Sequence, residues 1–121
     1  MLKILKISLA TIILFLSIIT HYSFSETNLT SVIPEVPPIL KKISFCESKN
    51  RQFDKNGDVL RGEINPKDVG YYQINEYYHL ESSRSLGFDI YTLEGNTRYA
   101  LYLYEHYGTD PWNWSKKCWF K

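Results

Sequence analysis

Glu47 is the residue whose surroundings in the sequence point most directly to chemistry. It lies four residues after Ile43 and seven after Leu40, in a segment whose apolar residues recur at helical spacing. Its carboxylate is therefore expected on or beside the buried face of a helix, where a charge costs free energy unless it is paired or used. Burial raises the pKa of a carboxyl group, so that it can stay protonated near neutral pH and act as a general acid. The alternative is a structural carboxylate that tyrosine or backbone groups satisfy.

A second group of oxygen-bearing side chains, Asp54, Asn56 and Asp58, is spaced like the start of a calcium-binding loop. The pattern then fails, because glycine stands at position 4 rather than 6 and position 12 is Asn65 rather than glutamate. Asn56-Gly57 between apolar-containing arms is instead typical of a β-hairpin with a type I′ turn, in which both central residues have positive φ. We therefore expect a hairpin here and no calcium.

No other metal, cofactor or nucleic-acid site is expected from the composition. His79 and His106 are not spaced as a zinc pair, and the chain has no H-E-x-x-H segment. Two cysteines are too few for a four-cysteine zinc site or for a disulfide-dense miniprotein. The formal net charge of +1 gives no electrostatic case for nucleic acid, and 16% aromatic residues argue against a disordered chain.

The first 25 residues have the layout of a secretory signal peptide. Lys3 and Lys6 give a positive start, Ile7–Thr20 is apolar or small, and small residues stand at −3 and −1 of a cut before Glu26. The apolar run is short for a transmembrane helix, which needs about 20 residues, and the alternative is a retained N-terminal membrane anchor. In either case we expect the rest of the chain to be exported, to the periplasm, the cell envelope or the extracellular space.

Export gives the two cysteines a structural interpretation. Cys46 and Cys118 can pair in an oxidising compartment, and the alternative is two unpaired buried thiols. A bridge between them would close a loop of about 72 residues, for which the chain-entropy model gives roughly 4 kcal/mol. Since a domain of about 80 residues has a small core, such a bridge would matter to its stability.

The rest of the chain is expected to be mainly α with a small β-hairpin, in a single compact domain. Three prolines among polar residues make 26–38 an extended linker, which leaves 39–121 as the folded unit. Helical spacing predicts a first helix over 39–50, and Asn75 can cap a second helix that ends at Gly87.

A third helix is expected from Leu93 to Tyr107, with Thr92 as its N-cap and Gly108 as its stop. Glu94 and Arg98 are spaced as an exposed i,i+4 ion pair. The apolar positions predict a buried face made of Leu93, Ala100, Leu103, Tyr104 and Tyr107.

Three segments, in this order, resemble the lysozyme-like superfamily. Phe45-Cys46-Glu47-Ser48 looks like the helix end that carries the catalytic glutamate of animal lysozymes and, as a Glu-Ser pair, of bacterial lytic transglycosylases. Asp68–Asn75 resembles the D-x-G-x-x-Q-I-N segment that follows a hairpin in animal lysozymes, and Gly108–Cys118 resembles G-x-x-x-W-x-x-W-x-x-x-C with one residue fewer between the tryptophans. The resemblance covers roughly 43–119 and extends to small exported lysozyme-like proteins of bacteria.

The resemblance implies roles for two carboxylates. Glu47 takes the position of the general acid that protonates the leaving oxygen of a glycosidic bond. Asp68 matches the second carboxylate of animal lysozymes, which acts as nucleophile or stabilises the oxocarbenium-like transition state. The alternative for Asp68 is a turn residue that bonds backbone N–H groups, because Asn65-Pro66-Lys67-Asp68 is also good turn sequence.

The same resemblance implies a set of substrate-binding side chains. The amides of Gln73 and Asn75 can bond sugar hydroxyl and N-acetyl groups, the alternatives being a structural amide and a helix cap. Of the aromatic residues, one of Tyr71 and Tyr72 can stack on a sugar, and for each of them core packing is the alternative. The full set of expected substrate-binding residues is Ser48, Tyr72, Gln73, Asn75, Tyr99 and Trp112.

These residues lead to three functional hypotheses. The first is a muramidase that cleaves the β-1,4 bond between N-acetylmuramic acid and N-acetylglucosamine in peptidoglycan, with Glu47 as general acid and no cofactor. The second is a lytic transglycosylase that forms 1,6-anhydro-muramoyl products with a single glutamate. The third is a non-catalytic cell-wall-binding protein that keeps the fold. All three have peptidoglycan glycan strands as the partner of an expected monomer.

Overall fold

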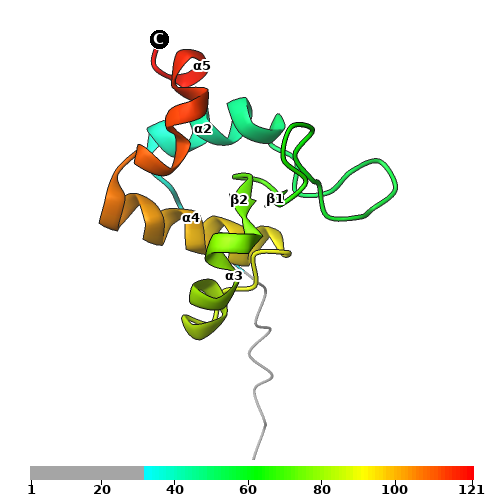
Figure 1. Ribbon diagram of the computed structural model, residues 1–121. Coiled ribbons are helices and arrows are strands. Elements are labelled where there is room, and N and C mark those ends of the chain that lie inside the picture. The colour runs from blue at the N-terminus through cyan, green and yellow to red at the C-terminus, as the bar shows by residue number, and fades with distance from the viewer. Residues whose placement is uncertain (1–31) are drawn as a thin grey trace, which may run out of the picture. The chain divides into compact units, whose positions relative to one another are not determined.

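The computed structural model describes residues 32–121, so the predicted signal peptide, residues 1–25, lies outside the described part of the chain. These residues form a small α-rich domain with a two-stranded antiparallel sheet and one disulfide, which confirms the expected class at this level (Figure 1). None of the helices in residues 32–121 has the length and apolarity needed to cross a membrane. The elements are α2 (Pro38–Ser48), β1 (Asp68–Val69), β2 (Ile74–Asn75), α3 (Glu76–Ser85), α4 (Leu93–Tyr107), the 3-10 helix η1 (Asp110–Ser115) and α5 (Lys116–Trp119).

Helix α2 begins at a proline, whose missing N–H costs nothing in the first turn of a helix. Leu40 and Ile43 are fully buried, as the apolar stripe predicts. The helix ends two residues before the expected position 50, because Lys49 and Asn50 adopt left-handed conformations with φ of 58° and 59°. The N–H of Asn50 then bonds the carbonyl of Ser44, which closes the last turn.

The predicted turn around Asn56-Gly57 forms, but the type I′ assignment is wrong. Only Gly57 has a positive φ, of 87°, and its N–H donates to the carbonyl of Asp54. Asp54 Oδ1 also accepts from the N–H groups of Asn56 and Asp58, so the aspartate side chain organises the turn. One isolated bridge, Phe53↔Val59, is all the pairing in these arms, and the regular strands lie further along the chain.

Strands β1 and β2 pair antiparallel, with Asp68 opposite Asn75 and Val69 opposite Ile74. The four residues between them form a tight turn in which Gly70 and Gln73 have positive φ of 72° and 50°. This turn lies between α2 and α4 in Figure 1. The sheet therefore presents Asp68 at its outer end and a tightly folded Gly70–Gln73 segment at its inner end.

Helices α3 and α4 follow the predicted capping residues. Asn75 accepts hydrogen bonds from the N–H groups of Tyr77 and Tyr78, and Thr92 accepts from Gly95. The Glu94–Arg98 ion pair is present at 2.9 Å.

The predicted buried face of α4 is only partly right. Ala100 and Leu103 are buried, but Tyr107 is 58% exposed and the fully buried Asn96 was not foreseen. The buried face of α4 includes Asn96 because this side of the helix packs against the Gly70–Gln73 turn, where Asn96 accepts from the N–H of Tyr72.

The first and last helices of the described chain, α2 and α5, pack together and are joined by a disulfide. Disulfide Cys46–Cys118, the bridge considered from the sequence, joins α2 to α5, which lie side by side in Figure 1. Residues 32–37 have no regular secondary structure, and Val36 packs against the core. The buried apolar residues are Leu40, Ile43, Val69, Tyr72, Ile74, Ile90, Tyr99, Ala100, Leu103, Trp112 and Trp119.

Candidate active site

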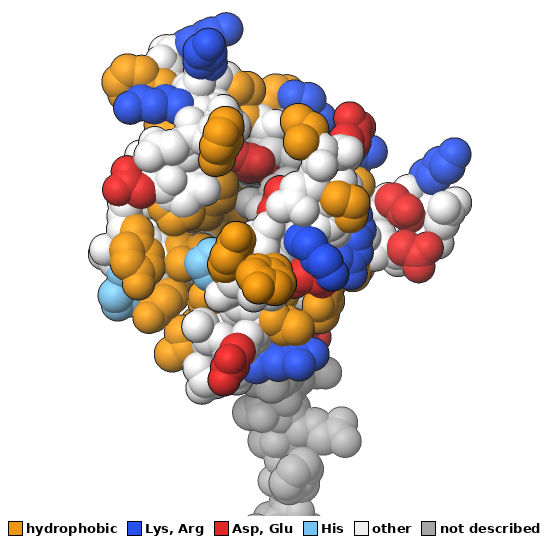
Figure 2. Space-filling view, in the orientation of Figure 1, with side chains coloured by type: hydrophobic (Ala, Val, Ile, Leu, Met, Phe, Trp, Pro, Cys, Tyr) orange, Lys and Arg blue, Asp and Glu red, His pale blue; other side chains and the backbone are white. Residues whose placement is uncertain are grey.

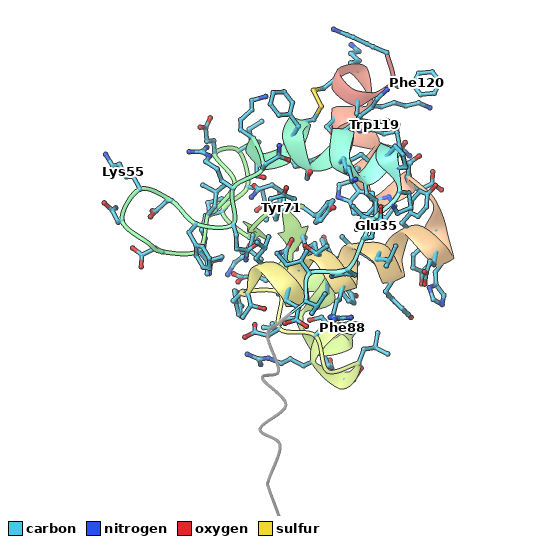
Figure 3. All side chains as sticks on the ribbon, turned by 180° about the vertical axis from the view of Figure 1, so that it is seen from behind. Glu35, Lys55, Tyr71, Phe88, Trp119 and Phe120 are labelled. Carbon is cyan, nitrogen blue, oxygen red and sulfur yellow. A yellow bond between two sulfur atoms is a disulfide. The ribbon has the colours of Figure 1, made fainter. Side chains whose placement is uncertain are left out.

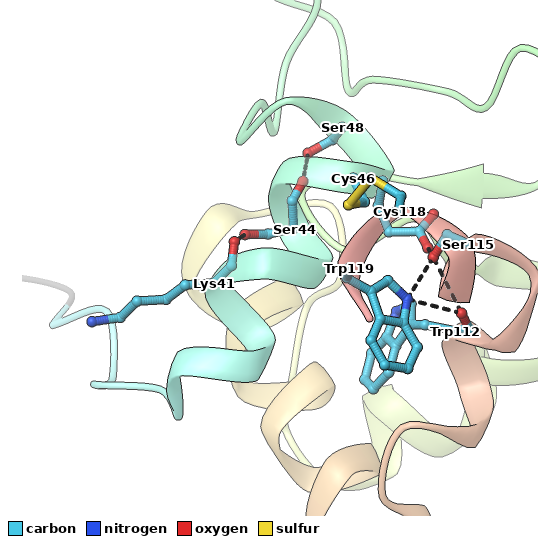
Figure 4. The surroundings of a disulfide bond; sticks show 9 residues. Lys41, Ser44, Cys46, Ser48, Trp112, Ser115, Cys118 and Trp119 are labelled. Atoms are coloured by element: carbon cyan, nitrogen blue, oxygen red, sulfur yellow. Dashed lines mark hydrogen bonds between the residues drawn. A yellow bond between two sulfur atoms is a disulfide. The ribbon is translucent and has the colours of Figure 1, made fainter. Parts of the chain in front are cut away.

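Glu47 lies in the last turn of α2, half-buried, with its carboxylate directed at the C-terminal segment. Ser115, the last residue of η1, donates a hydrogen bond from Oγ to Glu47 Oε1. Ser115 is itself held in place, because Trp119 Nε1 donates to its Oγ at 3.0 Å. The disulfide is three residues further along the chain, so the Glu47–Ser115 contact is next to the covalent link between the two segments (Figure 4).

Three influences set the pKa of Glu47. Burial, the largest of them, raises the pKa above its ordinary value, because the charged form loses hydration. The hydrogen bond from Ser115 lowers the pKa, and the negative charge of Asp68 raises it. Glu47 is therefore biased toward the protonated form, and Asp68 is near enough to contribute to that bias.

Asp68 is held at the end of β1 by two amide side chains. Asn75 Nδ2 donates to Asp68 Oδ1 at 2.7 Å across the strand pair, and Asn65 Nδ2 donates to the same oxygen at 3.3 Å. Within residues 32–121, the other carboxylate oxygen, Oδ2, accepts no hydrogen bond from a side chain or the backbone. The carboxylate is therefore fixed through one oxygen and keeps the other available.

Two buried amides, those of Gln52 and Asn96, hold the Gly70–Gln73 turn, and neither was expected from the sequence. Gln52 Oε1 accepts from the N–H of Tyr71 at 2.8 Å, and Asn96 Oδ1 accepts from the N–H of Tyr72 at 2.9 Å. A Cβ added to Gly70 would lie 2.5–2.7 Å from these two amides, so only glycine lets the backbone approach them this closely.

Ser48 and Trp112, both expected to bind substrate, donate to the same turn. Ser48 Oγ lies 2.7 Å from the carbonyl oxygen of Tyr71, and Trp112 Nε1 donates to the carbonyl oxygen of Tyr72 at 3.0 Å. Both side chains are buried, at 4% exposure each. In this structure they tie the end of α2 and the C-terminal segment to the backbone beside Asp68.

The two expected tyrosines are also inside the domain. Tyr72 is 1% exposed and packs against Trp112, with ring centroids 6.1 Å apart. Tyr99 is 1% exposed, and its hydroxyl lies 3.0 Å from Nδ1 of His79 on α3. Burial lowers the pKa of His79, which favours the neutral ring in this contact.

Gln73 and Asn75 both make structural hydrogen bonds. Gln73 Nε2 donates to the carbonyl of Gly70 at 2.8 Å, inside its own turn. Asn75 caps α3 with its oxygen and holds Asp68 with its nitrogen, so both ends of this amide are in use.

Exposed aromatic side chains occur on both chain segments that border the two carboxylates. Tyr77 and Tyr78 directly follow the Asn75 cap and are 77% and 73% exposed, and Trp114, next to Ser115, is fully exposed. Figure 2 shows acidic side chains in a recess of this face with hydrophobic side chains around it. Trp112 or Trp114 was expected from the sequence as an apolar wall beside Glu47, whereas Tyr77 and Tyr78 were not assigned to the site, because tyrosine more often fills cores.

The arrangement can supply a proton donor, Glu47, and a fixed carboxylate, Asp68, close enough for the charge of Asp68 to raise the pKa of Glu47. Among residues 32–121, no group of three or more His, Cys, Asp or Glu side chains could hold a metal ion. Comparison of the chain with protein-family models, with characterised protein sequences and with solved structures finds no match.

Proposed function

We propose that the protein cleaves the glycan strands of peptidoglycan at the bond between N-acetylmuramic acid and N-acetylglucosamine, with Glu47 as general acid. The observation that supports this most is the half-buried Glu47, whose pKa is raised by burial and by the charge of Asp68. A glycosidase needs such a pair, one carboxyl that keeps its proton and one carboxylate that stabilises positive charge.

In the proposed reaction Glu47 donates its proton to the glycosidic oxygen as the bond to the anomeric carbon breaks. Positive charge develops on the sugar ring, and Asp68 stabilises it through the oxygen that Asn65 and Asn75 leave free. Water then adds to the anomeric carbon and returns a proton to Glu47. Ser115 orients the Glu47 carboxyl throughout, as a positioning residue.

The exposed aromatic rings support the choice of a sugar polymer as substrate. The apolar faces of pyranose rings stack on exposed tyrosine and tryptophan, and Tyr77, Tyr78 and Trp114 offer such faces on the segments that contain Asn75 and Ser115. The expected aromatic contacts at Tyr72 and Trp112 are buried here, so stacking is assigned to these exposed rings instead.

The test is Glu47→Gln assayed on purified peptidoglycan. The substitution keeps the size of the side chain and an acceptor for Ser115, and it removes the proton donor. We expect nearly complete loss of soluble glycan release, with Glu63→Gln in an exposed loop as the matched control that keeps full activity. Digestion by Glu47→Gln at the wild-type rate would rule out the proposal, and binding without product release by the wild type would favour a non-catalytic wall-binding protein.

A second candidate, a lytic transglycosylase, is favoured by the way Asp68 is held. Its Oδ1 is occupied by Asn65 and Asn75, which is also what a purely structural carboxylate would look like. In a transglycosylase Glu47 acts alone: it donates its proton to the leaving glycosidic oxygen, and then takes the proton of the 6-hydroxyl of the muramoyl sugar as that oxygen attacks its own anomeric carbon.

The masses of the products separate these two candidates. A 1,6-anhydro end means internal attack, and a free reducing end means attack by water. Asp68→Asn, which can still accept from Asn75, should abolish most activity of a hydrolase and leave a transglycosylase active.

A further inference from the structure

Six lysines lie on two segments of the domain, helix α2 with its cap and helix α5 with the C-terminal residues. Residues 38–49 and 116–121 contain these six lysines and a single acid, Glu47, whereas the rest of the described chain holds six basic and eleven acidic residues. The positive charge of a nearly neutral domain is thus concentrated on two segments that the disulfide joins. The lysines are Lys41, Lys42 and Lys49 on α2 and its cap, and Lys116, Lys117 and Lys121 on α5 and the C-terminal residues.

Two phenylalanines are exposed among these lysines. Phe45 is 53% exposed and Phe120 is 73% exposed. Lys49 Nζ lies 4.6 Å from the centroid of the Phe45 ring, and Lys116 Nζ lies 5.1 Å from that of Phe120. We call this surface, made of the six lysines and these two rings, the lysine face. Figure 2 shows blue and orange side chains together at this end, above the position of α5 in Figure 1.

A hollow of about 420 Å³ lies within the lysine face. It is lined by Phe45, Trp119 and the disulfide together with Lys41, Lys42 and Lys121. Apolar groups surrounded by ammonium groups are the arrangement that lets a protein enter the boundary between lipid headgroups and acyl chains.

We propose that the lysine face docks the domain onto an anionic lipid bilayer, with Phe45 and Phe120 entering the headgroup region. The ammonium groups match the negative surface of such a bilayer, and each lysine near the surface strengthens binding. A soluble anionic polymer would satisfy the lysines equally but would leave the two rings in water, so the exposed rings favour the bilayer.

Docking in this way would direct the carboxylate site away from the lipid. Phe45 and Glu47 are two residues apart on α2, which places them about 200° apart around the helix axis. The inference does not rest on the proposed function, because it uses none of the carboxylate site.

The test is co-sedimentation of the full chain with vesicles, either phosphatidylcholine alone or phosphatidylcholine mixed with phosphatidylglycerol. Lys42→Glu/Lys117→Glu should weaken binding to the mixed vesicles at least about 20-fold. The control Lys55→Glu/Arg84→Glu carries the same charge change at exposed positions outside the face and should bind like the wild type. Figure 3 shows Lys55 on a loop at the far side of the domain from Phe120. The apolar N-terminal run is the same in every variant, so differences report on the lysine face.

Phe45→Ser/Phe120→Ser should also weaken binding to the mixed vesicles, with the lysines intact. Equal binding of the face and control charge variants would overturn the proposal, as would equal binding to both kinds of vesicle. If the serine variant bound like the wild type and soluble poly(glycerol phosphate) displaced the vesicles, the partner would be an anionic polymer, and the bilayer assignment would be wrong. Lys42→Gln/Lys117→Gln gives a milder version of the same test if the charge reversal lowers stability.

Discussion

At the scale of single residues, the chemistry of the site depends on the opposing influences on the pKa of Glu47. Burial and the charge of Asp68 raise this pKa and favour the protonated form, whereas the hydrogen bond from Ser115 lowers it. A general acid is most useful when its pKa is close to the working pH. Ser115 therefore adjusts the proton affinity of Glu47.

Ser115→Ala should raise the pKa of Glu47, because it removes the one hydrogen bond that favours the ionised form. Since the proposed general acid acts when protonated, the alkaline limb of the pH–activity profile should move to higher pH. NMR titration of the Glu47 carboxyl gives the same quantity without an activity assay. Ser85→Ala, at the exposed end of α3, is the control, and an unchanged or lower limb would contradict the role given to Ser115.

Glu47→Gln should make the domain more stable near neutral pH. The folded pKa of Glu47 is raised, so its favourable contribution is full below the unfolded value of about 4.3 and is lost as pH rises through the folded value. Glutamine resembles the protonated acid and escapes that loss. Each kcal/mol gained should raise the melting temperature by roughly 4–8 °C for a domain of this size, measured by circular dichroism.

The same measurement at low pH serves as the control. At about pH 3 and below, where Glu47 is protonated in both folded and unfolded chains, wild type and Glu47→Gln should melt together. A wild type more stable than the variant near neutral pH would mean that the ionised carboxylate is favourably paired.

At the scale of elements, the strand pair and its turn are positioned by side chains from three other segments. The backbone of Tyr71 is hydrogen-bonded by the side chains of Gln52 and Ser48. The backbone of Tyr72 is hydrogen-bonded by those of Asn96 and Trp112. Two residues of strand on each side would not hold a turn of this shape without them. The short sheet is thus an extension of the helical core.

Asn96→Ala should cost about 3 kcal/mol or more of unfolding free energy. The substitution leaves the buried N–H of Tyr72 and the carbonyl of Val69 without this partner, and each unsatisfied buried group costs about 1–3 kcal/mol. Urea unfolding measures the change, and Asn113→Ala, an exposed asparagine in η1, should change stability by less than about 0.5 kcal/mol. A loss below 1 kcal/mol for Asn96→Ala, on the order of one ordinary hydrogen bond, would contradict the structural role given to this amide.

The elements also show which features the sequence could predict. The bounds of α4, its Thr92 cap and its Gly108 stop follow from local signals, and all three are present. The buried face of α4 depends on what packs against it, so apolar spacing predicted it only in part. The turn at Gly57 is set by the Asp54 side chain, which the Asn-Gly signal does not take into account. The Glu47–Ser115 contact joins residues 68 apart in the chain, so spacing alone could not reveal it.

At the scale of the whole molecule, the disulfide ties the helix of Glu47 to the segment of Ser115. Cys46 and Cys118 are 72 residues apart, and most of the described domain lies between them. The bridge therefore stabilises the carboxylate site and the lysine face together.

Cys46→Ala/Cys118→Ala should lower the unfolding free energy by up to about 4 kcal/mol, from the entropy that the cross-link removes from the unfolded chain. Urea unfolding with and without reductant provides the control, because reductant should bring the wild type to the level of the variant and leave the variant unchanged. Equal stability of the oxidised wild type and the variant would show that the bridge adds nothing to the fold.

The bridge also makes the part of the chain that holds both carboxylates a covalent ring. Glu47, Asp68 and Ser115 all lie between the two cysteines. An exposed part of that ring is the turn at 54–58, which reaches away from the core and is closed by its own hydrogen bonds. A protease that cuts this turn opens the ring without releasing a fragment, since the two pieces stay joined through sulfur. The nicked protein keeps both carboxylates in one covalently joined molecule.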